Sequence, residues 1–219
     1  MLDIENLNKK IPENFPFELK EYKFPQENPL SECKCNENHI GGWYIDEKLC
    51  DDLKDYFWSK KQLHRIGIVG NFEIHQDVKK STDLVISNRN VDDPVFKYRL
   101  YLQSCLDLYF KKYTALSKEN HGDLRISSNY MLQYYKPGEG FYKEHCERSS
   151  KMVANRVLAF MTYLNDVDDG GTEFKYQGVI TPAKKGLTFL WPVDWTHTHK
   201  EQISESKDKY IITGWYNFD

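Results

Sequence analysis

The chain lacks several features that would assign it to a specialised class of protein. Its 219 residues contain no run of about twenty consecutive apolar residues, which a membrane-spanning helix requires, and residues 1–6 hold no apolar signal core. Basic and acidic residues nearly balance, 30 against 33, so no charged surface for nucleic acid or anionic lipid is expected. We therefore predict a cytoplasmic protein whose partners include neither nucleic acid nor membrane.

Cysteine is also too sparse and irregular to serve as a framework. The five cysteines are odd in number and scattered along the chain. This pattern is typical of reduced thiols rather than of a small disulfide-rich fold. Cys33 and Cys35 lack the two-residue spacer and the second cysteine pair of a zinc site. We expect ordinary thiols at both positions.

The remaining composition is that of a folded chain, with 40% hydrophobic and 15% aromatic residues. Residues 1–42 are polar and rich in proline, which indicates an amino-terminal arm with one strand near residues 17–24. Asp46 can cap a helix, because the apolar residues that follow recur at helical spacing. Asp93 and Pro94 can cap and begin a second, longer helix that runs to about residues 119–122.

Beyond residue 124 the pattern changes to short strands separated by turn residues, which is typical of a sandwich or barrel. The expected strands are 126–135, 142–147, 157–164, 172–174, 178–180, 186–191, 196–200 and 210–216. We predict a mainly β fold, a double-stranded β-helix (jelly roll) backed by the amino-terminal helices. One domain, 1–219, then consists of an arm with supporting helices and strands (1–123) and a catalytic core (124–219).

His145 and Glu147 suggest a metal site within this core. In an extended strand, residues i and i+2 point to the same side, so both can hold one cation while Cys146 faces away. A histidine from the cluster at residues 195–199 can supply the third ligand. Two imidazoles and one carboxylate on one octahedral face leave positions open, as is usual for non-haem Fe(II) oxygenases.

The third ligand can be His197 or His199. Each has a lysine ten positions later, Lys207 or Lys209. Lys209 opens the β-rich run at residues 210–216, whereas Lys207 belongs to a charged turn. This context favours His199, with His197 beside the site or at the surface.

Several ordered motifs resemble the 2-oxoglutarate/Fe(II) oxygenases of the prolyl 4-hydroxylase type. The resemblance covers residues 129–218. It rests on YKEHCE at 142–147, Arg156 followed by MTYLN at 161–165, GGTEF at 170–174, GLTFLW at 186–191, and His199 with KYIITGW at 209–215.

The resemblance implies that His145, Glu147 and His199 bind iron. It also implies that Lys209 pairs with the far carboxylate of 2-oxoglutarate, a role that suits the point charge of a lysine on a strand. Further residues are implied around the same pocket: Tyr135, Tyr142, Tyr163 and Thr188 for the cosubstrate, and Arg156 as a catalytic residue.

The implied activity is a dioxygenase that hydroxylates a C–H bond, above all of a prolyl residue in a peptide or protein, and releases succinate and CO2. Its cofactors would be Fe(II), 2-oxoglutarate and O2, with ascorbate in support. Two alternatives stay open: hydroxylation of a free amino acid or other small molecule, and a catalytically impaired jelly roll that only binds metal or ligand. The last follows from Glu147, because the family usually has aspartate there and glutamate is one methylene longer.

Overall fold

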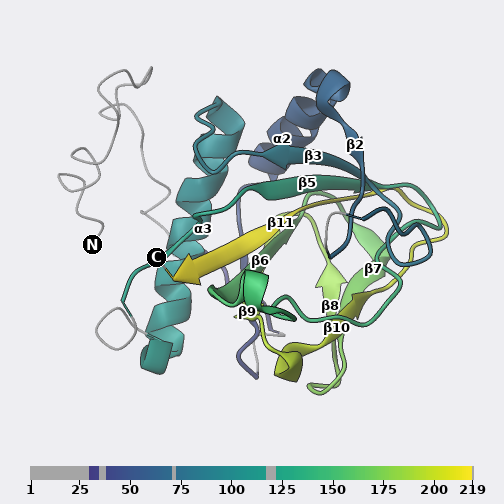
Figure 1. Ribbon diagram of the computed structural model, residues 1–219. Coiled ribbons are helices and arrows are strands. Elements are labelled where there is room, and N and C mark those ends of the chain that lie inside the picture. The colour runs from purple at the N-terminus through teal and green to yellow at the C-terminus, as the bar shows by residue number, and fades with distance from the viewer. Residues whose placement is uncertain (1–29, 35–37, 71–72, 117–121, 219) are drawn as a thin grey trace.

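A large antiparallel sheet dominates the computed structural model, which describes residues 30–34, 38–70, 73–116 and 122–218 (Figure 1). The sheet has eight strands, and β4 pairs with β11 beside the main path. In spatial order the strands are β1 (Gly41–Tyr44), β9 (Leu187–Pro192), β6 (Arg156–Tyr163), β11 (Lys209–Phe218), β5 (Tyr130–Tyr135), β3 (Thr82–Ile86) and β2 (Arg65–Ile66), with β4 at Leu124–Arg125.

A smaller antiparallel sheet packs against one face of the large sheet. Its three strands are β10 (His199–Glu201), β7 (Val167–Phe174) and β8 (Val179–Ala183), in that order. Apolar side chains from both sheets form one buried cluster, including Phe174 from the small sheet and Phe189 from the large one. Two facing antiparallel sheets fit the expected jelly roll.

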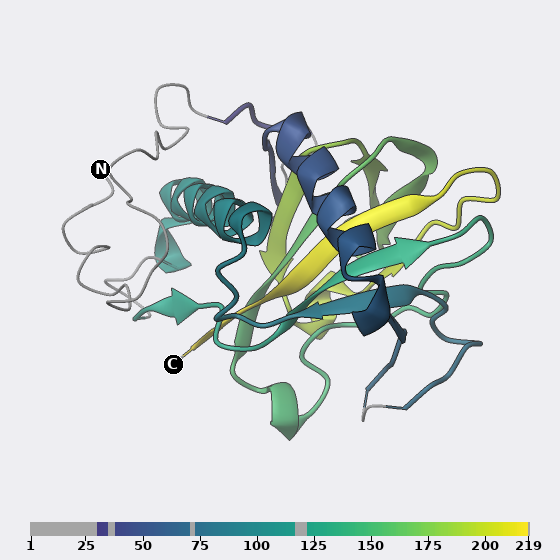
Figure 2. The same cartoon turned by 90° about the horizontal axis from the view of Figure 1, so that it is seen from above.

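Two helices cover the opposite face of the large sheet (Figure 2). In α2 (Glu47–Ser59), the Asp46 side chain accepts a hydrogen bond from the Lys48 amide at 2.8 Å, as a helix cap should. The longer helix, α3 (Asp93–Lys112), packs on β9 and β1. Four short 3-10 helices complete the described elements: η2 (Lys61–Leu63), η3 (Thr114–Leu116), η4 (Lys151–Val153) and η5 (Trp195–His197).

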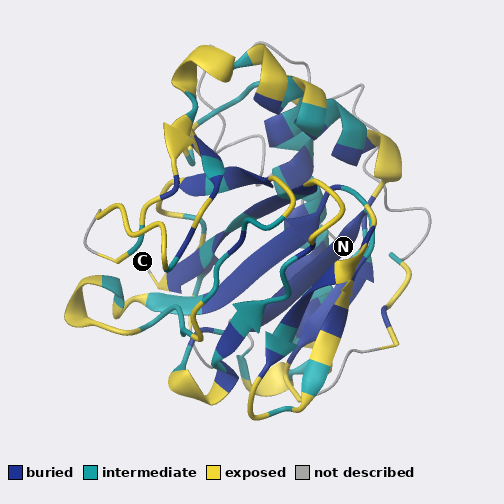
Figure 3. Ribbon diagram, turned by 90° about the vertical axis from the view of Figure 1, so that its right-hand side faces the viewer, coloured by how far each residue is buried: buried dark blue, intermediate teal, exposed yellow. Residues whose placement is uncertain are grey.

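The alternating direction of the side chains along β6 explains why the large sheet contributes to two buried layers, one on each of its faces. Leu158 and Phe160 join the cluster beneath the helices, while Ala159 and Met161 join the cluster between the sheets. Successive side chains of a strand point to opposite faces, so one sequence supplies both interiors. The central strands are accordingly buried on both faces, as the dark blue ribbon in Figure 3 shows. The mainly β class with supporting helices is therefore confirmed.

Three details of the prediction were wrong. The cap of α3 is Asp92 rather than Asp93, and the helix ends at Lys112, before the predicted end. Residues 142–147 form no regular strand, because only isolated bridges occur in that stretch. The predicted strand at residues 17–24 lies outside the described residues.

The expectation of thiols throughout was also wrong. Cys33 is disulfide-bonded, whereas Cys50, Cys105 and Cys146 are free. Burial raises the pKa of Cys50 to about 12, so its thiol stays protonated at neutral pH. In the described part of the chain, no helix combines the length and apolar character needed to cross a bilayer.

Candidate metal centre

A backbone bridge brings two histidines from distant segments side by side. The amide of His145 donates to the carbonyl of His199 at 2.9 Å, and the amide of His199 donates to the carbonyl of His145 at 2.9 Å. Residues that exchange both hydrogen bonds lie directly opposite each other in an antiparallel pair, so their side chains share one face. The two imidazole rings accordingly lie with centroids 4.4 Å apart.

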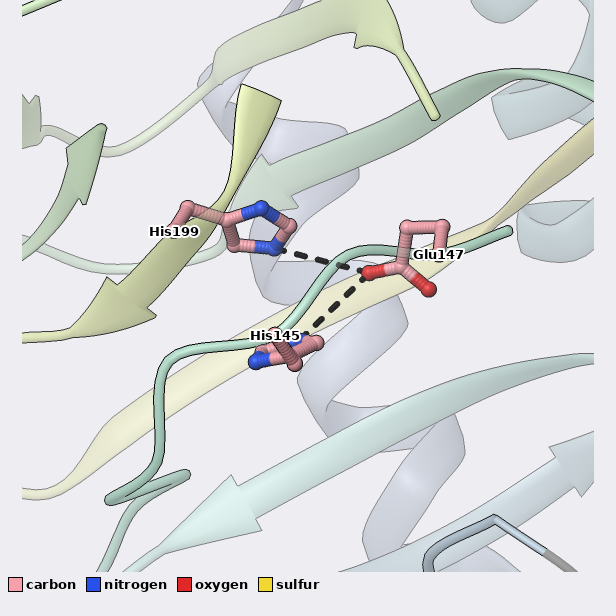
Figure 4. A group of neighbouring side chains, drawn as sticks. All are labelled: His145, Glu147 and His199. Carbon is pink, nitrogen blue, oxygen red and sulfur yellow. Dashed lines mark ion pairs between the residues drawn. The ribbon is translucent and has the colours of Figure 1, made fainter. Parts of the chain in front are cut away.

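Glu147 completes the group from a different anchor. Its amide donates to the carbonyl of Val193, just after β9, at 3.1 Å. Its Oε1 lies 3.6 Å from Nε2 of His145 and 3.5 Å from Nε2 of His199 (Figure 4). The side chain thus reaches both imidazoles although the segment from residue 142 to 147 is not a regular strand.

Both histidines present the nitrogen that a metal ion requires. Nδ1 of His145 lies 3.0 Å from the carbonyl oxygen of Lys143, and Nδ1 of His199 lies 2.9 Å from that of His197. Because a carbonyl can only accept, each Nδ1 carries the proton and each neutral ring has its lone pair on Nε2, toward Glu147. This outer hydrogen bond is the usual device that orients histidine ligands.

The three donors fit a divalent cation. The ligand atoms of His145, Glu147 and His199 all lie within 4.8 Å of one another. An octahedral ion bound at about 2.1 Å holds neighbouring ligand atoms about 3 Å apart, close to the 3.6 Å and 3.5 Å that separate Oε1 of Glu147 from the two imidazole nitrogens. The donor set of two imidazoles and one carboxylate matches Fe(II) in particular.

The pKa directions of Glu147 and His145 show that the carboxylate of this site is ionised and favours a positive charge beside it. Burial alone would raise the pKa of Glu147, but its contacts with the imidazoles of His145 and His199 together outweigh burial, and the pKa lies well below its usual value. Burial alone would lower the pKa of His145, yet Glu147 prevails and the pKa is raised. A metal ion must therefore compete with protons for the His145 imidazole.

Arg156 and Trp215 hold the carboxylate in place. Arg156 donates from Nη1 to the backbone carbonyl of Glu147 at 2.9 Å, and Trp215 donates from Nε1 to Oε2 of Glu147 at 2.8 Å. The guanidinium stacks over the Trp215 ring at 3.4 Å from its centroid. Arg156, which the sequence predicted to be catalytic, contacts the Glu147 backbone and the Trp215 ring. Trp215 was missed, although a partly buried indole that needs a hydrogen-bond acceptor was a usable signal.

His197 does not belong to the group formed by His145, Glu147 and His199. Its Nε2 donates to the carbonyl of Asn38 at 3.0 Å, and its Nδ1 lies 3.1 Å from Oγ1 of Thr196. Burial lowers the pKa of His197, and the Asn38 carbonyl offsets only part of that effect. His199 is thus the histidine that meets His145 and Glu147.

The residues expected to hold the cosubstrate divide into two sets. Tyr135 and Lys209 are paired across β5 and β11, and both are buried in the layer between the sheets. Tyr163 lies in the same layer, where its hydroxyl bonds with Thr172 at 2.7 Å. Thr188 is not part of this set. Its hydroxyl bonds with Thr162 at 2.7 Å, within the layer under the helices.

Tyr142 lies apart from the buried tyrosines. It lines a surface cavity of about 550 Å³ together with Lys200 and Glu201, and its hydroxyl donates to the carbonyl of Gly138 at 2.9 Å.

Lys209 already has a partner within the protein. Its Nζ lies 2.8 Å from Oε2 of Glu201, while Oε1 of Glu201 accepts from the Tyr135 hydroxyl at 3.1 Å. Burial alone would raise the pKa of Glu201, but the charge of Lys209 and the hydrogen bonds from Lys209 and Tyr135 together outweigh burial, and the pKa is lowered. The role of Glu201 was missed, although period-two alternation puts it on the His199 side of β10.

Comparison with known proteins gives one family and a set of similar folds. Residues 130–217, from β5 to β11, match the family model of the 2OG-Fe(II) oxygenase superfamily. No curated protein matches the chain significantly.

Among solved structures, the fold is similar to three prolyl hydroxylases. The Pseudomonas putida prolyl-4-hydroxylase has 14% identity, a TM-score of 0.61, and coverage of 83% of this chain and 93% of its own. A Trichoplax adhaerens prolyl hydroxylase, in complex with a peptide fragment of the hypoxia inducible factor oxygen degradation domain, has 14% identity, a TM-score of 0.65, and coverage of 84% and 86%. A viral collagen prolyl hydroxylase from Paramecium Bursaria Chlorella virus-1, in complex with 2OG, has 15% identity, a TM-score of 0.61, and coverage of 85% and 100%.

Proposed function

We propose that this chain, whose residues 130–217 match the family model of the 2OG-Fe(II) oxygenase superfamily, is a 2-oxoglutarate-dependent dioxygenase that hydroxylates a C–H bond of a prolyl residue in a peptide or protein. The observation that carries this proposal is the convergence of His145, Glu147 and His199. The prolyl hydroxylase folds support the substrate class, one of them in complex with a peptide. The alternative of a free amino acid as substrate is separated by the experiment below.

Each residue has a defined part in this proposal. His145, Glu147 and His199 hold Fe(II), while Arg156 and Trp215 keep the carboxylate aimed at it. Lys209, with Tyr135 and Tyr163 in the same layer, receives the far carboxylate of 2-oxoglutarate, and Tyr142 lines the approach. When bound, iron and cosubstrate together supply the oxidant from O2, with succinate and CO2 as by-products. The protein supplies the orientation of the ligands and a dry layer between the sheets.

The wider predictions from the sequence belong to the same proposal. The described sheets and helices act as one catalytic domain, and ascorbate sustains turnover by keeping the iron reduced. A cytoplasmic location is part of the proposal: the free thiols of Cys50, Cys105 and Cys146 are typical of that compartment, whereas the disulfide of Cys33 is not.

The test incubates the full chain with Fe(II), 2-oxoglutarate, ascorbate and air. Proline-containing peptides are compared with free proline, and products are read as succinate and as the mass gain of one oxygen atom. Glu147→Gln keeps the size of the side chain but removes its charge, and serves as the inactive control. Succinate that is formed only in the presence of a peptide, and only by the unaltered protein, is the expected result. Oxygen gain on free proline alone would move the substrate class to small molecules, and no succinate with any substrate would contradict the proposal.

One observation favours a second function, that of a metal-binding module without efficient turnover. The Glu201 carboxylate sits on Lys209, where the cosubstrate is expected. Anaerobic addition of Fe(II) and 2-oxoglutarate separates the two functions, because chelation gives a visible charge-transfer band. A band without succinate formation in air would favour the module.

A further inference from the structure

Glu201 takes both of the partners that the proposed function reserves for the cosubstrate. One oxygen of its carboxylate pairs with Nζ of Lys209 at 2.8 Å, and the other accepts from the Tyr135 hydroxyl at 3.1 Å. Lys209 is only 2% exposed, so it has no route to water while the sheets stay packed. Any carboxylate that binds to Lys209 must therefore meet Glu201 at the same atoms.

The balance of buried charge prevents the Glu201 carboxylate and the far carboxylate of the cosubstrate from lying beside Lys209 at the same time. A second buried ion pair is formed by Lys79 and Asp83 at 2.7 Å, each about 4% exposed. Gln133 links that pair to Tyr135, since it donates to Asp83 at 3.1 Å and its Oε1 lies 2.9 Å from the Tyr135 hydroxyl, whose one proton it shares with Glu201. Two cations thus already balance two anions along this chain of contacts. A third buried carboxylate would lack a counter-ion, which is strongly unfavourable in a dry interior.

Glu201 has an exit that Lys209 lacks. It lies at the end of β10 and lines the surface cavity of about 550 Å³, together with Tyr142 and Lys200. A rotation of its side chain toward that cavity, which Asp168, Asp169 and Glu173 also line, would return the carboxylate to water. Turning Glu201 out as the cosubstrate enters would preserve the balance of buried charge.

We propose that Glu201 is an internal competitor for Lys209, which a dicarboxylic 2-oxo acid must displace in order to bind. This inference rests on the proposed function. Glu201 thereby lowers the affinity for 2-oxoglutarate, because part of the binding free energy is spent on breaking the contacts with Lys209 and Tyr135. A 2-oxo acid without a second carboxylate can reach the metal with Glu201 still in place, so Glu201 sets the preference between these two classes.

The experiment measures binding rather than turnover. The full chain is loaded with Mn(II), a redox-inert substitute for Fe(II), and titrated by calorimetry with 2-oxoglutarate and with 2-oxobutyrate. The variants are Glu201→Val, which removes the carboxylate, and Glu201→Gln, which keeps the size of the side chain. Glu173→Gln is the matched control, since Glu173 lines the same cavity but pairs with Lys200 at 3.3 Å. Thermal unfolding confirms first that each variant is folded.

For Glu201→Val we expect the dissociation constant of 2-oxoglutarate to fall by about tenfold or more, with 2-oxobutyrate changed less than about threefold. Glu201→Gln should change in the same direction by a smaller factor, and it carries the test alone if the valine variant does not fold. Glu173→Gln should bind both acids as the unaltered protein does.

A crystal structure with Mn(II) and 2-oxoglutarate should place the Glu201 carboxylate away from Nζ of Lys209. Equal or weaker binding of 2-oxoglutarate by the Glu201 variants, when the unaltered protein binds it, overturns the inference but leaves the proposed function intact. Failure of every protein, including the unaltered one, to bind either 2-oxo acid in the presence of metal overturns both.

Discussion

The two buried layers on either side of the large sheet differ in what they enclose. Beneath the helices the layer is apolar, and its tyrosine hydroxyls have partners: Tyr109 donates to the carbonyl of His39 at 2.8 Å, and Tyr216 to that of Leu102 at 3.0 Å. Between the sheets lie the buried ions Lys209 and Glu201, and next to His199 the Trp191 indole nitrogen has no partner within the described chain.

This difference separates stability from chemistry within one domain. An apolar layer stabilises the fold through area removed from water, and it tolerates no unpaired charge. A layer that buries ions contributes little net stability, yet it can hold a metal ion and a charged cosubstrate in a dry setting. Mutations in the layer beneath the helices should therefore mainly affect folding, and mutations in the layer between the sheets should mainly affect binding.

The largest expected effect comes from removing a metal ligand in the layer between the sheets. His199→Ala should weaken Mn(II) or Fe(II) binding by more than the roughly 10–100-fold that loss of an outer hydrogen-bond partner costs, and should abolish succinate formation. The control is His197→Ala, which removes a nearby imidazole that meets Asn38 instead of Glu147. Its metal affinity should stay within about tenfold, because alanine keeps the backbone carbonyl of residue 197 that orients His199. Calorimetric titration with Mn(II) checks both, and equal losses in the two variants would contradict the assignment of His199.

A large but purely structural effect is expected from the helix side. Phe160 is fully buried and packs edge-on against Tyr130 and Tyr216. Phe160→Ala should lower the free energy of unfolding by about 3–5 kcal/mol, through lost contacts and the cavity left behind, with metal affinity retained. Tyr163→Phe, on the same strand but facing the small sheet, should cost only about 0.5–1.5 kcal/mol, since it deletes one hydroxyl. Urea unfolding and Mn(II) titration test the pair, and a folded Phe160→Ala protein without metal affinity would break the distinction between the layers.

The smallest expected effect is on how the free energy of unfolding depends on pH. Burial lowers the pKa of His197, so the unfolded chain binds more protons at this residue than the folded one. Its contribution to stability is full above the unfolded pKa of about 6.5 and is lost as pH falls from there through the lowered folded pKa. His197→Asn should remove this part of the pH dependence.

The measurement is urea unfolding of metal-free protein at several pH values, with and without the substitution. The difference in free energy of unfolding between the two proteins should shrink as pH falls below neutrality. A difference that stays constant with pH would show that His197 carries no such linkage.

Local patterns determined much of this protein. The helical spacing after Asp46 and the turn-punctuated strands beyond residue 124 predicted the mainly β class with its supporting helices, because those periods depend only on neighbours along the chain. The ordered histidines, carboxylate and lysine predicted the metal group and the lysine beside it, because few chemistries need that donor set.

Only the tertiary structure decided which faces meet. The bridge between His145 and His199 selects His199 over His197, and the register of β9 turns Thr188 toward the helices. The carboxylate of Glu201 reaches Lys209 by the same long-range packing. Strand periodicity says which residues share a side but not what that side will face, since register and pairing depend on hydrogen bonds between segments far apart in the chain.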